Sequence, residues 1–461
     1  MNQKKICIIG AGIGGLTAGV LLTKKGYSVH IFEKEPMIGG RALSFTDFTE
    51  LNLQEYLRIL GHYYMHIPFS SPDLATIFEK KMLNGYKLDL GYHAIGGGVL
   101  SNLNDLLSEI NEHVDIFESS VGLIRKDGYD YPFLSTIDRI RIAPKILRML
   151  FASEKTLKKL DPIPMTETIK KYGKGKMKHI LEVFSRTITT MNNLDLISTG
   201  EMFRSQRNLY KGSKPVGYPK DGLHNVHDKL ARFIKNNGGG IHLKSPVEKI
   251  IVEDGKAIGV KVKGKEIGYD AVLSSVLVQD LFKITDEKEF PKDYVEYLKS
   301  LKGTGSLCAY YSLKKLDEDL IGKTFHFLER DVGVNGNDVV GMIDFMASDP
   351  TSGLAPKAEY LVQSYVICTP KEAKNKEILK KLKGLLDKNL KYLIPDYEKH
   401  LNWSIYPAIW HLDGVAKTIE NDKPDIKTPV ENLYLVGDCV KATGIGFNCA
   451  LNSAKQIVNF L

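Results

Sequence analysis

The stretch KICIIGAGIGGLTAGVLLTKKGYSVHIFE, residues 5–33, decides the fold of this chain. Its first five residues are mostly apolar and precede a run of glycines, after which residues 16–25 have helical character until Gly26 stops the helix. Residues 27–33 alternate apolar and polar side chains, which is typical of a strand. Residues 4–33 therefore predict one βαβ unit with parallel strands and a right-handed connection.

The glycine run lies between the strand and the helix, where a dinucleotide would bind. Gly10 permits the tight turn, Gly12 lets the backbone approach a pyrophosphate, Gly14 belongs to the same loop, and Gly15 permits close packing of helix on strand. The free N–H groups at the helix N-terminus favour negative charge. Glu33 ends the second strand and is placed to accept hydrogen bonds from ribose hydroxyls. Because an acid there would repel a 2′-phosphate, FAD or NAD suits this site better than NADP.

A second glycine pair follows at residues 39–40 and precedes Arg41. Gly40 and Arg41 can bring backbone amides and a guanidinium fork onto the same phosphates. Lys34, directly after the acid, is counted with this candidate site. A turn with a solvated arginine is the open alternative for Arg41.

These motifs resemble the FAD-dependent family that includes phytoene desaturases, carotenoid isomerases, retinol saturases, protoporphyrinogen oxidases and flavin amine oxidases. The resemblance covers residues 4–42, 216–262 and 432–461. It implies an α/β fold: a Rossmann-like FAD-binding domain of the GR2 type, with a cofactor site in separated stretches of the chain, and a second mixed α+β substrate domain. It also implies cofactor contacts along the adenine, the pyrophosphate and ribityl chain, and the flavin ring, in that order, from Val247, Gly437, Asp438, Gly444, Ile445 and Gly446.

The residues themselves support the C-terminal portion of this assignment. A strand ending in Gly437-Asp438, followed by a turn and a helix, offers one more helix N-terminus to a phosphate. Asp438 is expected to accept a sugar hydroxyl, and an ordinary N-cap is the open alternative.

The segment LDLGYH, residues 88–93, resembles the family segment that passes near the isoalloxazine ring. Tyr92 and His93 are therefore candidates for the substrate side, and a partly buried structural histidine is the alternative for His93. The sequence has no recognisable catalytic triad, zinc spacing or carboxylate pair, so we expect no metal site. In such a protein the flavin carries the redox chemistry, and the chain supplies orientation and electrostatics.

Length and composition indicate which broad class of protein this is. With 461 residues, 43% apolar and 26% charged, the chain predicts a globular protein of two subdomains. Its net charge of +8 is spread without the aromatic-interleaved basic stripe of nucleic-acid binders, so no nucleic-acid partner is expected. Five cysteines without a CxxC pair, a strand that begins at residue 4 and the lack of a long apolar run favour a cytoplasmic protein.

The character of the sequence changes along the chain and predicts five segments. Residues 99–214 have helical patterns and many lysines, and residues 285–424 mix strand signals with a lysine-rich helix. We expect FAD to be bound by three separate segments, residues 1–98, 215–284 and 425–461. Between them, residues 99–214 are expected to form a substrate or helical insertion, and residues 285–424 a substrate domain.

Residues 137–151 are basic and strongly apolar. Such a segment favours either peripheral contact with an anionic membrane surface or a plain surface helix. Pro144 is expected to interrupt the helix there.

The resemblance to desaturases and saturases implies hydride exchange with a carbon–carbon bond of a hydrophobic, isoprenoid or carotenoid-like substrate, in a direction that the sequence leaves open. Because no second nucleotide-binding loop is found, a quinone, oxygen or a protein is the expected electron partner. The alternatives are a flavin amine oxidase, caged by Trp403, Tyr406 and Trp410, a protoporphyrinogen oxidase-like enzyme, and a non-catalytic prenyl-binding escort protein.

Overall fold

A parallel sheet of five strands forms the first half of the molecule in this computed structural model, which describes residues 3–209, 214–334 and 337–461. All neighbouring strands of this sheet are parallel. Its order is β11 (Gly240–His242), β2 (Ser28–Phe32), β1 (Lys5–Ile9), β15 (Ala271–Ser274) and β21 (Leu433–Leu435).

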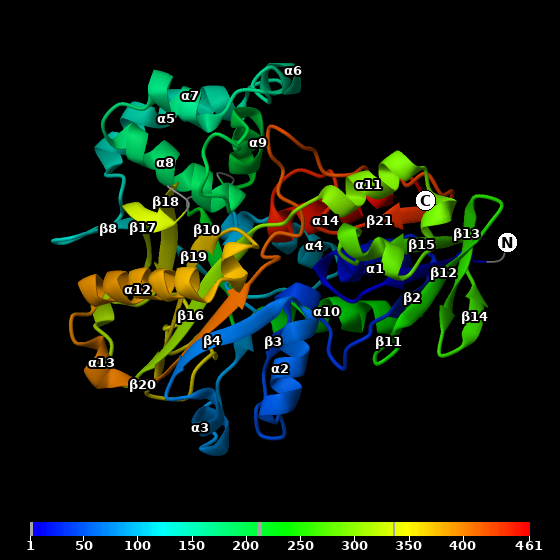
Figure 1. The fold of residues 1–461 in the computed structure, drawn as a ribbon, viewed down its shortest axis with the longest axis horizontal. Helices are drawn as coiled ribbons and strands as arrows, with labels where there is room; N and C mark the ends of the chain where they lie inside the picture. The colour runs from blue at the N-terminus through cyan, green and yellow to red at the C-terminus, as the bar shows by residue number, and fades with distance from the viewer. Residues whose placement is uncertain (1–2, 210–213, 335–336) are drawn as a thin grey trace.

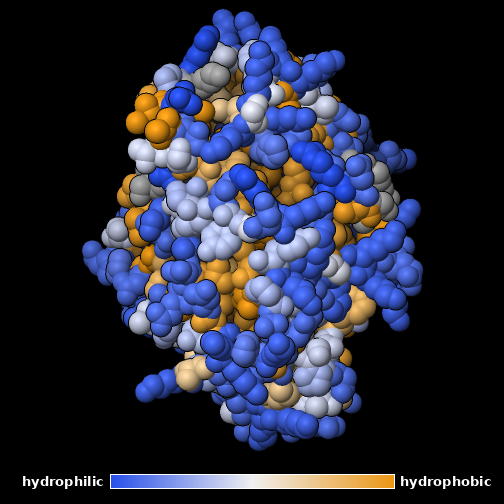
Figure 2. All heavy atoms as spheres, turned by 90° about the vertical axis from the view of Figure 1, so that its left-hand side faces the viewer, coloured by the Kyte–Doolittle hydropathy of each residue, from blue (hydrophilic) through white to orange (hydrophobic). Residues whose placement is uncertain are grey.

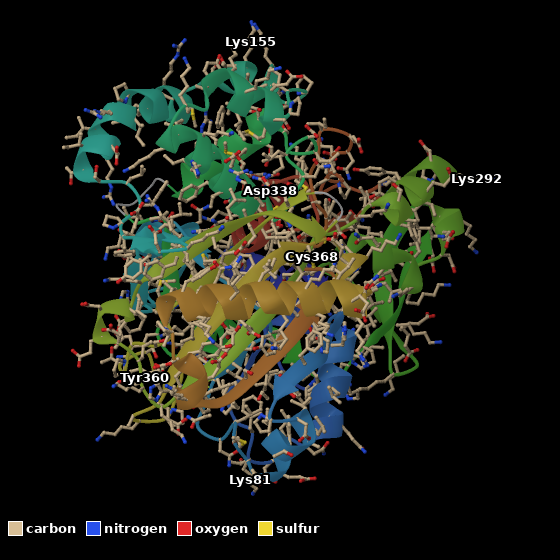
Figure 3. All side chains as sticks on the ribbon, turned by 60° about the vertical axis from the view of Figure 1, so that its left-hand side comes forward. Lys81, Lys155, Lys292, Asp338, Tyr360 and Cys368 are labelled. Carbon is tan, nitrogen blue, oxygen red and sulfur yellow. The ribbon has the colours of Figure 1, made fainter. Side chains whose placement is uncertain are left out.

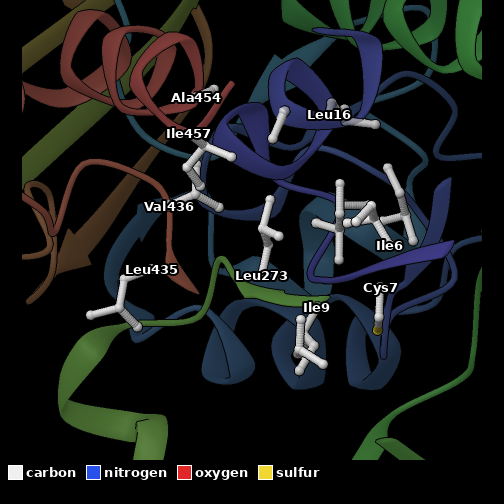
Figure 4. Packing of buried hydrophobic residues seen from close by; sticks show 14 of the residues in the cluster. Ile6, Cys7, Ile9, Leu16, Leu273, Leu435, Val436, Ala454 and Ile457 are labelled. Carbon is white, nitrogen blue, oxygen red and sulfur yellow. The ribbon is translucent and has the colours of Figure 1, made fainter. Parts of the chain in front are cut away.

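The first βαβ unit is confirmed as β1, α1 (Ile13–Lys24) and β2. Helices α10 (Leu223–Asn236) and α14 (Gly446–Ile457) pack beside α1. Figure 1 shows the red C-terminal helix beside the blue N-terminal one. Leu16 and Ile457 are fully buried in the core between helices and sheet, which Figure 4 shows from close by.

Strand order reverses beside β1. The chain adds β2 and β11 on one side of β1, and later places β15 and β21 on the other side. In open parallel sheets, ligands bind outside the carboxyl ends of the strands at such a reversal. The topology therefore predicts a ligand site between the loops after β1 and β15.

The second half of the molecule is built on an eight-stranded mixed sheet. Helix α12 (Lys376–Leu393) lies across one of its faces (Figure 3) and contributes Leu382 and Leu386 to the core there. The strand order is β4 (Met65–Ser71), β20 (Leu401–Ile409), β16 (Gly305–Leu313), β19 (Tyr360–Cys368), β18 (Asn337–Asp344), β17 (Thr324–Val334), β8 (Val121–Arg125) and β9 (Gly128–Asp130).

Sheet pairing crosses the expected segment boundaries. Strand β4, from the segment expected to bind FAD, pairs with β20 of the eight-stranded sheet. Strands β8 and β9, from the segment expected to form a substrate or helical insertion, extend the same sheet through β17. The two-domain α/β architecture is as expected, but each half is assembled from several stretches of the chain.

Helices α5 (Thr136–Leu150), α6 (Glu154–Lys158), α7 (Met165–Tyr172), α8 (Lys176–Thr189) and α9 (Thr199–Leu209) form a separate group at one edge (Figure 1). The expected interruption at Pro144 is wrong, because α5 continues through it. Proline removes one backbone hydrogen bond, while a capping box of Ser135 and Asp138 stabilises the start of the helix.

The remaining elements are short or connect the two halves. They are α2 (Leu53–His62), α3 (Leu74–Glu79), α4 (Asn102–Glu109), α11 (Lys292–Ser300), α13 (Tyr397–His400), β3 (Ser44–Phe45), β5 (Leu88–Asp89), β6 (Ile95–Gly96), β7 (Ile116–Ser119), β10 (Val216–Pro219), β12 (Val247–Glu253), β13 (Lys256–Val262) and β14 (Lys265–Gly268).

Candidate functional site

A cleft of about 390 Å³ opens at the carboxyl ends of the parallel strands. The loops after β1, β2, β15 and β21 all line it, which is where the reversal of strand order places a ligand. Its lining brings together most of the sequence-predicted residues: Gly10, Gly12, Gly14, Glu33, Lys34, Gly40, Arg41, His93, Val247, Gly437, Asp438 and Gly446.

Both ends of the chain form one wall of this cleft. A Cβ atom on Gly14 would lie 2.9 Å from the Cα of Gly437, so the first glycine loop and the C-terminal loop touch. The amide of Gly39 donates to the carbonyl of Ala11 over 2.8 Å, which fixes the second glycine pair against the first loop. The predicted joining of the two chain ends at one cleft is therefore present.

Gly15 acts on packing and does not line the cleft. A Cβ atom there would lie 2.1 Å from the carbonyl oxygen of Gly10, closer than any side chain allows. The strand and helix can approach this closely only with glycine at this position, as the sequence predicted.

Glu33 is 4% exposed and stands at the end of β2. Its carboxylate accepts hydrogen bonds from the amide of Ala11 over 2.7 Å and from the amide of Glu35 over 3.0 Å. Burial raises the pKa of Glu33, and the two amide hydrogen bonds oppose that rise. The side chain thus links the β2 loop to the glycine loop while lining the cleft.

Arg41 and Asp438 form an ion pair inside the cleft. The guanidinium also donates to the carbonyl of His411 over 3.0 Å, and the second oxygen of Asp438 accepts from the amide of Gly414 over 2.8 Å. Burial raises the pKa of Asp438, but the charge of Arg41 and its hydrogen bond lower it overall, well below the usual range. Arg41 is therefore a fixed positive charge, and the alternative of a solvated arginine is wrong.

A second buried cation supports the same loop. Lys423 is 4% exposed, and its ammonium group donates to the carbonyl of Asp438 over 2.6 Å and lies 3.5 Å from a carboxylate oxygen of Asp413. Burial raises the pKa of Asp413, and nearby Asp438 adds to that rise. Asp438 does not cap α14, whose N-cap is Ile445, so the N-cap alternative is wrong.

The turn at residues 444–446 leads directly into α14. Gly446 and Phe447 line the cleft, and the N-terminus of α14 has no side-chain cap. Gly444 and Ile445 instead line a small polar cavity beside Glu201 and other charged residues. The N-termini of α1 and α14 both adjoin the cleft, and unpaired helix N–H groups favour an anion.

The cleft also accommodates the sugar and base end of a nucleotide. Val247, at the start of β12, lines it together with Tyr63. The Tyr63 hydroxyl is buried and has no hydrogen-bond partner among the described residues, and Lys34 lies 5.8 Å from the centre of the Tyr63 ring. A buried hydroxyl without a partner is costly, so a polar ligand would satisfy it. The residues present therefore fit a dinucleotide.

His93 and Tyr92 differ in their surroundings. His93 lines the cleft, and its Nε2 lies 2.8 Å from the carbonyl of Leu90 and 3.1 Å from that of Arg41, so this nitrogen carries the proton. Tyr92 is 6% exposed, stacks on Tyr365, donates its hydroxyl to Asp344 and does not line the cleft. The structure brings only His93 to the cofactor candidates.

The aromatic cage weighed for an amine oxidase does not form from the three expected residues. Trp403 packs into the core on one face of the eight-stranded sheet, whereas Tyr406 packs into the core on the face covered by α12. Side chains of one strand alternate between faces, and a spacing of three separates these two.

Sequence reasoning missed some of the lining. Ser275 lines the cleft directly after β15, and Asp280 and Lys283 follow on the same segment and form an ion pair. The polar residues that end the apolar strand at 271–274 were the available signal, because neighbouring parallel strands end at the same edge of a sheet. No short sequence pattern indicated that Tyr63 would line the cleft, or that Asp413 and Lys423 would lie beside it.

Two features are absent from the residues that the structure describes. Within them, no group of three or more histidine, cysteine or acidic side chains is arranged to hold a metal ion. In the same residues, no helix has both the length and the apolar character needed to span a bilayer.

A family model described as flavin containing amine oxidoreductase matches residues 13–459. The 4,4′-diapophytoene desaturase (4,4′-diapolycopene-forming) of Methylomonas sp is 24% identical over 290 residues, 59% of this chain and 53% of that protein. The 1-hydroxycarotenoid 3,4-desaturase of Flavobacterium sp. is 24% identical over 327 residues, 68% of this chain and 64% of that protein. The chain therefore spans about half to two thirds of the length of these relatives.

Solved structures of low sequence identity share the fold. An oxidoreductase from Methanosarcina mazei has a TM-score of 0.72 at 21% identity, covering 99% of this chain and 100% of its own. A redesigned putrescine oxidase has a TM-score of 0.64 at 15% identity, covering 99% and 98%. A Rab GDI from Plasmodium falciparum has a TM-score of 0.56 at 15% identity, covering 99% and 97%. At this identity the last likeness concerns the fold alone and gives no support to an escort role.

The match over almost the whole chain agrees with the geometry. The cleft fits a dinucleotide, the fold is shared with flavoenzymes, and the cofactor is FAD. The chain belongs to the family of flavin containing amine oxidoreductases.

Proposed function

We propose that this protein exchanges a hydride between FAD and a carbon–carbon bond of a hydrophobic, isoprenoid or carotenoid-like substrate, by desaturation or saturation. The observation that supports this most directly is the single cleft in which Glu33 and the Arg41–Asp438 pair meet from opposite ends of the chain. The named relatives supply the substrate class, because two of them are carotenoid desaturases.

Residues from several loops of the cleft would hold the cofactor. Glu33 would accept ribose hydroxyls, and the N-terminus of α1 with Arg41 would face the diphosphate. Val247 would meet the adenine side, and Gly446, the residue of the turn 444–446 that lines the cleft, would lie beside the ring. Asp438 keeps Arg41 in place and has lone pairs left for a ribityl hydroxyl. The bound flavin supplies the hydride exchange.

His93 is the proposed residue on the substrate side. It lines the cleft and its Nε2 donates to the carbonyl of Arg41, so its ring orientation is coupled to the cofactor site. Tyr92 would act through positioning, since its hydroxyl is already donated to Asp344. Its ring stacks on Tyr365 and holds the backbone from which His93 projects.

The electron partner and the location are also proposals. A quinone or a protein would exchange electrons with the flavin, in agreement with the lack of a second dinucleotide loop in the sequence. Peripheral contact with a membrane surface would give access to a substrate dissolved in lipid.

A flavin amine oxidase or a protoporphyrinogen oxidase-like enzyme is the alternative within the same family. The family description and the putrescine oxidase fold agree with it. The separation of Trp403 and Tyr406 by the eight-stranded sheet disfavours the expected amine cage.

The test uses purified protein loaded with FAD. The protein is incubated without oxygen with detergent-dispersed acyclic polyenes of different saturation, in one series with a soluble quinone as electron acceptor for desaturation and in the other with the corresponding quinol as electron donor for saturation. The products are analysed by mass spectrometry. We expect loss or gain of two hydrogens per reacting bond, together with a change of flavin absorbance. Polyamine or porphyrinogen oxidation without any change in the polyenes would favour the alternative, and absence of flavin after reconstitution would overturn both.

A further inference from the structure

Helix α5 exposes a continuous apolar stripe. Ile137, Ile140 and Leu147 are 62%, 67% and 50% exposed, and Phe151, which ends the helix, is 83% exposed. Exposed Pro144 completes the series, whose spacings of three and four residues place all five side chains on one face of a helix. Thirteen large hydrophobic side chains are exposed among the described residues, and four of them lie within residues 137–151.

The inward face of α5 is already used. Met149 packs against the small core formed by α6 to α9, and its carbonyl accepts a hydrogen bond from Arg207 of α9. Because the helix is held from this side, the outer stripe is not needed to attach it to the protein. An apolar face that covers nothing within its own chain is typical of a surface that meets a partner or a membrane.

Positive charge surrounds the stripe. Residues 137–159 contain seven basic and two acidic residues, a net charge of +5. Exposed Arg141 and Arg148 flank the stripe along α5, and Lys155 projects outward from the edge of the helical group (Figure 3). Figure 2 shows hydrophobic groups at the surface between hydrophilic ones on the end of the molecule that carries these helices.

A second cleft lies beside α5. Its volume is about 390 Å³, and it is bounded by apolar residues of β8 and β17 and by the start of α8. Lys176 lines it and forms an ion pair with Asp138 in the first turn of α5 over 2.7 Å. Phe133, just before α5, also lines it. Arg125 and Arg330 line it as well, so α5 lies next to a cleft that is partly apolar and carries positive charge.

We infer that residues 137–151 form a docking surface for an anionic lipid bilayer. The apolar stripe enters the boundary between headgroups and acyl chains, while Arg141, Arg148 and the following lysines contact anionic headgroups. A second copy of this chain fits less well, because it would bring the same net positive charge against itself. The inference deepens the proposed use of a lipid-dissolved substrate, yet binding to vesicles is measured without any substrate.

The experiment measures co-sedimentation of FAD-loaded full-length protein with phosphatidylcholine vesicles, with and without phosphatidylglycerol. The stripe variant is Ile140→Ser/Leu147→Ser/Phe151→Ser, and the charge variant is Arg141→Gln/Arg148→Gln. The matched control is Leu243→Ser/Ile258→Ser, which removes two apolar side chains that are 38% and 39% exposed elsewhere. Circular dichroism and flavin absorbance check the fold of each variant.

We expect wild-type protein and the control to bind the anionic vesicles equally. The charge variant should bind about thirtyfold more weakly, since each arginine near an anionic surface contributes about fivefold. The stripe variant should bind about a hundredfold or more weakly than the wild type to each kind of vesicle that the wild type binds.

Three results would overturn the inference: no vesicle binding by the wild type, equal binding by the stripe variant, or loss of a dimer in light scattering on stripe substitution without any lipid binding. Measuring turnover of detergent-dispersed substrate tests the proposed reaction separately from the docking surface. Normal turnover without vesicle binding refutes the docking surface alone, and vesicle binding without hydride exchange refutes the proposed reaction alone.

Discussion

Glu33 shows how one side chain serves both the fold and the ligand. Its carboxylate holds the amides of Ala11 and Glu35, and both become unpaired in Glu33→Ala. Each unpaired buried amide costs about 1 to 3 kcal/mol. We expect the variant to bind FAD at least about tenfold more weakly and to melt at a lower temperature, as measured by flavin fluorescence and differential scanning calorimetry. Exposed Glu50→Ala is the control, and stoichiometric FAD in Glu33→Ala would contradict the site.

The ion pair of Arg41 and Asp438 leads to a prediction about stability without FAD. In Asp438→Asn the half-buried guanidinium, whose side chain is 23% exposed, loses its counter-charge. This costs at most about 3 to 5 kcal/mol, the range for a fully buried pair. Chemical denaturation of FAD-free protein should show this loss, and FAD should dissociate more readily. The exposed pair Arg125–Asp130 provides the control, because Asp130→Asn should change the free energy of unfolding by less than about 1 kcal/mol. Equal effects of the two substitutions would argue against a buried ion pair.

Buried Asp344 should make the free energy of unfolding depend on pH. Burial raises its pKa from the usual 3.8 to about 7, although the hydrogen bond from Tyr92 opposes this. Between these values the folded protein holds a proton that the unfolded chain has released, so the free energy of unfolding falls as pH rises from 3.8 toward 7. Asp344→Asn imitates the protonated acid and should flatten that slope in urea denaturation at several pH values. An unchanged slope would contradict the burial of this carboxyl.

At the scale of elements, the βαβ unit is where the sequence was most informative. Its strands were predicted to within one residue, because the glycine spacing and the apolar runs are local signals, whereas the helix begins at Ile13, three residues before the predicted start. The eight-stranded sheet was not predicted, since β4 and β20 pair across more than three hundred residues and nothing near β4 specifies that partner. The expected break at Pro144 was wrong for the opposite reason. Proline is a strong local signal for the end of a helix, but here the surrounding residues keep the helix continuous.

Close packing of α1 on β1 gives the prediction for this scale. Gly15→Ala places a Cβ atom 2.1 Å from the Gly10 carbonyl, so the loop must shift and FAD affinity should fall together with stability. Gly384→Ala is the matched control, because this glycine lies in α12 with no atom within 4 Å of a new Cβ. The control should be more stable by about 0.5 to 1 kcal/mol. Thermal melts with and without FAD measure both, and similar behaviour of the two variants would refute the packing argument.

For the whole molecule, the candidate site was predictable where motifs carry it and unpredictable where distant loops complete it. The glycine loop, Glu33 and the C-terminal Gly-Asp turn were found from short patterns, whereas Tyr63 and Lys423 reach the site only through tertiary folding. The strand order also explains why both chain ends are needed: β21 pairs with β15, which pairs with β1.

Because strands and loops from both ends meet at one cleft, FAD should stabilise the protein as a unit. A ligand that binds only the folded state adds RT ln(1 + [L]/Kd), about 2.7 kcal/mol at a hundredfold excess over Kd. Calorimetry should therefore show one transition that moves up by a few °C with FAD. Glu33→Ala should respond only at higher FAD concentration. If FAD shifted one of two separate transitions and left the other in place, the two halves would be energetically independent, and a cofactor held by both chain ends would be refuted.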